Sequence, residues 1–222
     1  IFLSIKPIFN FQYIKQLIKL TLPLGISQML VSLNTNIPRY FVEIFISTEM
    51  LGYFGAIAYV MSAGTTFVLA LSQAAITRLA KYYSNKQINK FKYLLNKLVL
   101  SGFIAGSLIL TIVIIWGDHI LTIIYTSEYS KFKNVFVLAM IAAMINYTSA
   151  FLGHAITSTR YFKYQPLINT ITVFASVASG LFLIPRLELV GAGMTLIISS
   201  TCQFLSRVVV LNSLLKKQLA VK

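Results

Sequence analysis

The sequence predicts an all-α, polytopic transmembrane helical bundle with six spans, and three observations support this fold class. Of the 222 residues, 57% are hydrophobic and 11% are charged, and the mean hydropathy is +0.80. Soluble domains contain about 45–50% apolar and about 25% charged residues, so the composition excludes a water-soluble globular fold. The second observation is a series of six long stretches without charged residues. The third is the uneven distribution of Lys and Arg among the loops between them.

The six charge-free stretches are each long enough to cross a bilayer, whose apolar core of about 30 Å needs roughly 20 helical residues. They contain 19, 28, 20, 26, 22 and 18 residues, and they run over 20–38, 50–77, 98–117, 134–159, 164–185 and 189–206. Only a short connection around Arg186 and Glu188 separates the last two. Because about 40 residues do not fit one crossing, we expect two spans joined by a tight turn rather than one kinked element.

The basic residues predict the orientation of these spans. Fifteen of the 19 Lys and Arg residues lie in the terminal segments and in the loops after spans two and four, whereas the other loops hold four basic residues and all five acidic ones. Cytoplasmic loops are enriched in Lys and Arg, so both termini are expected in the cytoplasm. The basic residues are spread over four segments and form no nucleic-acid motif, so anionic membrane lipids are the expected partner rather than nucleic acid.

Two connecting segments have two interpretations each. Residues 84–97 combine four lysines with apolar side chains, which fits a basic helix on the membrane surface or an extension of the third span. Residues 117–133 mix aliphatic and polar side chains, which fits an interfacial segment or the end of a helix. In the third span, Gly102 and Gly106 are expected to allow close helix packing.

Polar residues within the spans indicate which helices face an interior or a cavity, because a polar group facing lipid is costly. The first span is the most polar, with Asn34, Asn36 and terminal Arg39 after Pro23. Gln73 and Arg78 make the second span polar at its cytoplasmic end. In each case the alternative is ordinary hydrogen bonding between helices.

Three arginines at span ends, Arg39, Arg78 and Arg160, have two interpretations. Such residues commonly anchor a helix at the headgroups. Alternatively, their guanidinium groups hold an anionic substrate such as a pyrophosphate, which a planar bidentate donor suits. No span contains Asp or Glu, the groups expected of a carrier for cations or protons, so an anionic substrate is favoured.

The sequence shows no constellation typical of an enzyme or a metal site. The acids lie in outer loops, the two histidines are far apart in sequence, and Cys202 is the single cysteine. We therefore expect no catalysis, no metal and no cofactor. The chain begins with Ile1 and has no signal-peptide pattern, so we expect it to be part of a longer open reading frame.

Short motifs at the span ends follow one another in a characteristic order. They include LPLG at 22–25, NIPRYF at 36–41, LGYF at 51–54, RLAKYY at 78–83, INY at 145–147, TRYF at 159–162 and GAG at 191–193. Together they resemble the polysaccharide flippases of the multidrug/oligosaccharidyl-lipid/polysaccharide exporter superfamily, over nearly the whole chain.

This resemblance implies the C-terminal six-helix lobe of a two-lobe transporter, with a cytoplasmic interlobe linker at 1–16 and the lobe at 17–222. The implied function is translocation of an oligosaccharide linked to an isoprenoid pyrophosphate from the inner to the outer leaflet of the bacterial cytoplasmic membrane. The implied partners are this lipid-linked oligosaccharide, the N-terminal lobe and the polysaccharide polymerase machinery. The family's cavity helices assign a substrate role to Asn34, Asn36, Arg39, Gln73 and Arg78, and chemistry alone adds Arg160. The alternatives are a multidrug exporter of the same superfamily and a non-transporting scaffold for glycan assembly.

Overall fold

The computed structural model describes residues 11–220, which form helices joined by short turns and contain no strand. In chain order the elements are α1 (Phe11–Phe45), α2 (Thr48–Ser84), α3 (Ile88–Ile124), the 3₁₀ helix η1 (Ser127–Phe132), α4 (Lys133–Ser158) and α5 (Tyr164–Ala220). The prediction of an all-α bundle is confirmed for these residues. Residues 11–16, in the predicted linker, begin α1, and residues 1–10 lie outside the described part.

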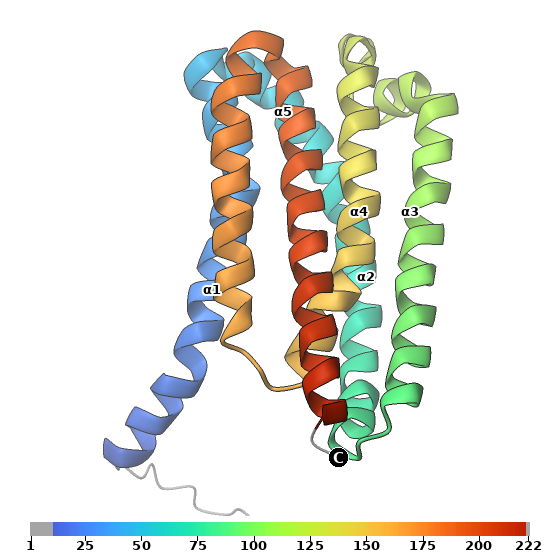
Figure 1. The fold of residues 1–222 in the computed structure, drawn as a ribbon. Coiled ribbons are helices and arrows are strands. Elements are labelled where there is room, and N and C mark those ends of the chain that lie inside the picture. Colours follow the sequence, from blue (N-terminus) through green and yellow to red (C-terminus); the bar gives the residue numbers. More distant parts are fainter. Residues whose placement is uncertain (1–10, 221–222) are drawn as a thin grey trace, which may run out of the picture.

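The longest helix, α5, folds back on itself (Figure 1). Glu188 has a left-handed, non-helical conformation (φ 50°, ψ −129°) that interrupts the helix. The side chains of Gln203 and Asn169, on opposite sides of this break, are joined by a hydrogen bond of 3.4 Å. A Cβ atom at Gly191 would collide with the backbone of Leu183, so only glycine fits this tight turn. The expected turn between residues 185 and 189 is therefore confirmed.

Four helical stretches are long and apolar enough to cross a membrane, by length and composition. A fifth qualifies if the two parts of α1, Phe11–Lys19 and Thr21–Phe45, which meet at an angle of 40°, are counted as one span. In this count α5 is one stretch, although it turns back at Glu188. The sequence-based number of six spans stays a prediction.

The two ambiguous connections have different structures. The segment 84–97 is mostly the start of α3, which is preceded by a turn at 85–87, so the helical-extension interpretation is the correct one. In α3, Trp116 departs from helical geometry (φ −114°, ψ 15°), and the helix continues beyond this kink to Ile124 before η1.

Helix α4 forms the centre of the packing, because it contacts α2, α3 and α5 extensively. Figure 1 shows α4 between α3 and the second half of α5. Helix α1 packs mainly on α5, and it touches α2 at few positions. Gly102 faces Phe151 and Gly106 faces Met144, so the close packing predicted for these glycines is confirmed.

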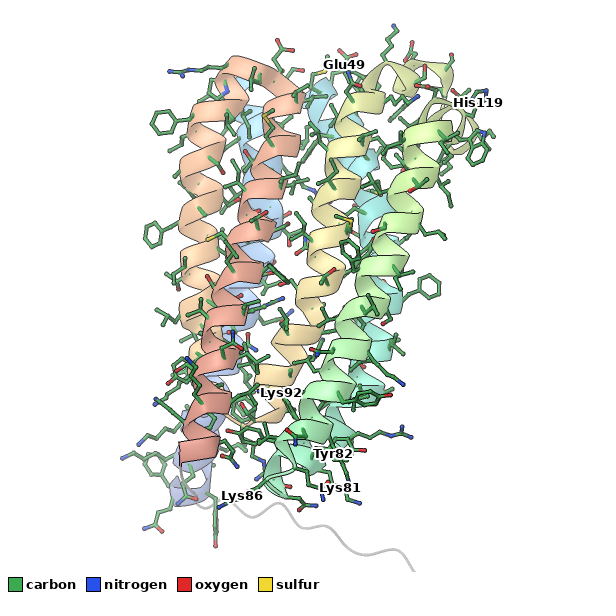
Figure 2. All side chains as sticks on the ribbon, turned by 45° about the vertical axis from the view of Figure 1, so that its right-hand side comes forward. Glu49, Lys81, Tyr82, Lys86, Lys92 and His119 are labelled. Atoms are coloured by element: carbon green, nitrogen blue, oxygen red, sulfur yellow. The ribbon has the colours of Figure 1, made fainter. Side chains whose placement is uncertain are left out.

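Charged side chains gather at the two ends of the bundle. Figure 2 shows Glu49 and His119 at one end, and Lys81, Lys86 and Lys92 at the other. We call these the acidic end and the basic end. The separation of basic from acidic loops expected from the sequence is therefore present in the fold.

An aromatic cluster connects η1 to the start of α2 at the acidic end. The rings of Tyr53 and Tyr129 lie 4.8 Å apart, and Tyr125 stacks on Tyr129 at the same distance. Burial, and then the neighbouring Tyr129, raise the pKa of Tyr125. Its hydroxyl therefore stays protonated, and it donates a 2.9 Å hydrogen bond to the carbonyl of Ala56.

Candidate functional site

The predicted site residues of α1 lie where this helix meets α2. The guanidinium carbon of Arg39 lies 5.4 Å from the centre of the Tyr59 ring, a cation–π contact between the two helices. The Nε of Arg39 and the Oδ1 of Asn34 are buried without a hydrogen-bond partner. Pro38 has no N–H to donate to the carbonyl of Asn34, so this carbonyl lacks the usual helical hydrogen bond. This part of α1 therefore holds several polar groups whose bonding capacity is unused.

Asn36 is less available, because its Nδ2 donates a 2.9 Å hydrogen bond to the carbonyl of Ser32 in the preceding turn. Gln73 and Arg78 are exposed on α2. In the described part of the chain neither side chain has a hydrogen bond or an ion pair. Exposure on a membrane-length helix fits both the anchoring interpretation of Arg78 and a cavity role.

Arg160 follows the end of α4 in a left-handed conformation (φ 62°) and is exposed. It lines a cavity of about 330 Å³ between the ends of α2 and α4, together with Lys81, Tyr83 and the aliphatic hydroxyls of Ser84, Ser158 and Thr159. These hydroxyls donate to carbonyls of their own helices. The cavity is thus a shallow basic feature at the basic end of the bundle.

The six predicted residues do not form one cluster. On α2, Tyr59 and Arg78 are 19 residues apart, which corresponds to about 28 Å along the helix. Arg39, which contacts Tyr59, therefore lies far from Arg78. The structure divides the candidates into a group on α1 (Asn34, Asn36, Arg39) and a group toward the basic end (Gln73, Arg78, Arg160).

A chain of buried polar side chains crosses the interior between α1 and α5. Asn169 donates to the carbonyl and to the hydroxyl of Ser27, at 3.2 and 3.3 Å, and accepts from Gln203. Nearby, Asn146 of α4 donates to Ser200 at 3.0 Å. These bonds hold α1, α4 and both halves of α5 together. Asn146 thus forms a hydrogen bond between two helices.

Arg207 is a functional candidate that the sequence pattern did not reveal. The sequence assigns it to the C-terminal tail after the last span, but α5 continues to Ala220, so Arg207 lies inside the helix. Its Nη1 donates to the carbonyl and to the hydroxyl of Ser149 on α4, both at 3.0 Å. Its Nε is buried without a partner.

The helical spacing of polar residues in the sequence indicates that Arg207 faces the interior of the bundle. Ser200, Gln203 and Arg207 are spaced at i, i+3 and i+7, so they share one face of the helix. Leu205 is 56% exposed, and Arg207 is turned about 200° away from it at 3.6 residues per turn. The arginine therefore points into the bundle and away from the apolar surface.

Comparisons with known proteins give one informative similarity. The chain is 29% identical over 197 residues to the capsular polysaccharide biosynthesis protein CapF of Staphylococcus aureus. The alignment covers 89% of this chain and 50% of CapF, so the chain spans about half the length of this curated relative. No protein-family profile matches the chain. No solved structure matches it either.

Proposed function

We propose that the chain forms one lobe of a bacterial membrane flippase, which moves a lipid-linked oligosaccharide from the inner to the outer leaflet during cell-surface polysaccharide synthesis. The similarity to a capsular polysaccharide biosynthesis protein over 89% of the chain supports the pathway class. The membrane-length apolar helices support a step within the bilayer.

The observation that carries the proposal is the kind of polar group held inside this apolar bundle. The groups are cations and amides: Arg39 and Asn34 have unpartnered buried atoms, and Arg207 points inward. A carrier of a lipid-linked sugar must shelter a pyrophosphate and sugar hydroxyls while the lipid tail stays in the membrane. Guanidinium groups suit binding of the pyrophosphate, and amides suit hydrogen bonding to the sugar hydroxyls. An organic cation would instead need interior carboxylates, so a multidrug exporter is the weaker candidate.

The architecture that goes with this function has six passes in this chain. Each half of α5 crosses once, because the helix turns back at Glu188 at the acidic end. The basic end faces the cytoplasm, as the bias of Lys and Arg favours. A second six-helix lobe accounts for the length of CapF that this chain does not cover. The partners are the lipid-linked oligosaccharide, anionic lipids at the basic end and the polymerase that uses the exported glycan.

The test is the leaflet location of lipid-linked glycan intermediates in the source bacterium after deletion of the longest open reading frame that contains this chain. Accumulation on the cytoplasmic face, reversed when the frame is restored, is the expected result. Unchanged intermediates in a strain without a redundant exporter would contradict the proposal. In that case, altered efflux of drugs would point to a multidrug exporter, and loss of enzyme complexes would point to a scaffold.

A further inference from the structure

Arg207 uses only part of its hydrogen-bonding capacity. Nη1 is occupied by Ser149, whereas Nε has no partner and no hydrogen bond engages Nη2 within the described residues. Nε and Nη2 form one edge of the planar guanidinium group, and such an edge matches two oxygens of a carboxylate or a phosphate. Ser149 thus fixes the group in a position that leaves this edge without a partner.

No acidic side chain of the protein neutralises this cation. All five Asp and Glu residues lie among the described residues, and none is paired with Arg207. Arg207 is 19 residues from the break at Glu188, which corresponds to about 28 Å along α5 and brings it toward the basic end. A cation held among apolar helices is costly unless an anion or several hydrogen bonds compensate it. Nη1 has two hydrogen bonds to Ser149, so an anion that compensates the remaining edge has to come from outside the side chains of this chain.

The packing against α4 leaves room for the guanidinium group at a glycine. Gly153 of α4 lies directly beneath it, and a Cβ atom at this position would be 3.0 Å from the guanidinium carbon. Any larger residue there would displace the arginine. Nε is buried, whereas Nη2 is not among the buried atoms without a partner and Arg207 as a residue is partly exposed, so a ligand approaches the edge from the Nη2 side.

We propose that Arg207 binds a phosphate group of the transported lipid through its Nε–Nη2 edge, while Ser149 and Gly153 hold the guanidinium group in place. This inference rests on the proposed flippase function and adds a binding residue outside the pair α1 and α2. The ligand is an isoprenoid diphosphate. The phosphate of an ordinary phospholipid headgroup offers similar chemistry, and the experiment separates the two.

The experiment measures the binding of a polyisoprenoid diphosphate without sugar, and of the matching polyisoprenoid alcohol, to the product of the longest open reading frame in zwitterionic lipid nanodiscs. We expect the wild type to prefer the diphosphate, and Arg207→Gln to lose at least tenfold of this preference. Lys216→Gln removes an exposed cation from the same helix and is the matched control, which should change the preference by less than twofold. A merely structural arginine would affect the diphosphate and the alcohol equally.

Arg207→Lys keeps the positive charge but not the bidentate edge, and it is used if Arg207→Gln does not fold. A reduced preference for the diphosphate in this variant supports the proposal. A wild-type preference for the diphosphate in every folded Arg207 variant overturns the assignment of Arg207 but does not contradict the proposed flippase function. Equal competition by phosphatidylglycerol assigns Arg207 to a lipid headgroup and also overturns it. If the wild type itself does not distinguish diphosphate from alcohol, the proposed function fails together with this inference.

Discussion

The bundle has a tightly packed side, formed by α3 and α4, and a loosely packed pair, α1 and α2, which touch each other at few positions although α1 packs on α5 and α2 packs on α4. The space around three glycines illustrates this difference in packing. A Cβ atom at Gly106 of α3 would lie 2.7 Å from the backbone of Met144, whereas one at Gly25 or Gly52 would meet nothing within 4 Å. Close backbone contact fixes the relative position of α3 and α4. The contact between α1 and α2 has no such constraint at these two glycines, although Gly64 of α2 packs closely on Tyr147 of α4.

The polar groups differ in the same way. In the described residues of α3 and α4 every buried polar side-chain atom has a hydrogen-bond partner. Helices α1 and α2 contain three that have none, on Asn34, Arg39 and Ser72, and α5 contains two, on Ser176 and Arg207. Unsatisfied buried groups are costly in a static structure and are a common feature of ligand sites. Under the proposed function, the packed side acts as the scaffold, and the ligand contacts lie on α1, α2 and the inner face of α5.

The largest effect on stability is expected from Gly106→Ala, which forces α3 and α4 apart. Overpacking of this kind costs about 1–3 kcal/mol. The control is Gly52→Ala in α2, which has open space and should be neutral or stabilising by up to about 1 kcal/mol, because alanine favours helix. Thermal unfolding in detergent measures both variants. Equal melting temperatures for the two would contradict the division into a packed and a loose side.

Asn169→Leu should have the next largest effect, because it leaves Gln203 and Ser27 without their partner in the buried interior. The expected loss is about 1–3 kcal/mol in the free energy of unfolding. Asn212→Leu, at an exposed position of the same helix, is the control and should have little effect. Chemical unfolding in detergent compares them. A wild-type stability of Asn169→Leu would show that this polar chain does not hold α1 against α5.

Arg39→Ala tests the loose pair through function rather than stability. We expect export of lipid-linked glycan to fall roughly fivefold, the change that a loss of about 1 kcal/mol in substrate binding gives. The amount of protein in the membrane should not change. Arg186→Ala, at an exposed arginine of the acidic end, is the control and should export normally. Full export by Arg39→Ala would contradict a role in substrate binding and favour the interpretation of Arg39 as a membrane anchor.

Tyr53→Phe is expected to have the smallest effect. It keeps the aromatic contacts and removes only the long hydrogen bonds to Glu128 and Glu49, at 3.3 and 3.5 Å. The loss of stability should stay below about 1 kcal/mol, with faster hydrogen exchange confined to η1. Tyr93→Phe, at an exposed position, is the control. Destabilisation of the whole bundle by Tyr53→Phe would mean that η1 contributes more than local order.

The fold was largely predictable from the sequence because hydropathy and charge act over long stretches. Charge-free runs and glycine spacing predicted the helices, the turn near Glu188 and close packing at Gly102 and Gly106, but not that α4 is the helix packed there. The candidate site was less predictable, because it depends on which helices become neighbours. Arg207 follows an 18-residue charge-free run and therefore has the pattern of a terminal anchor, although α5 continues past it and packs it against Ser149.

Transport in a purified system is the most direct test of the central claim. The product of the longest open reading frame containing this chain is reconstituted into vesicles with a fluorescent isoprenoid diphosphate-linked sugar, and the fraction of probe accessible from each side is followed over time. The account predicts protein-dependent movement of the probe between leaflets, slowed by Arg39→Ala and unaffected by Arg186→Ala. Correctly inserted protein that leaves the probe in its original leaflet would contradict it.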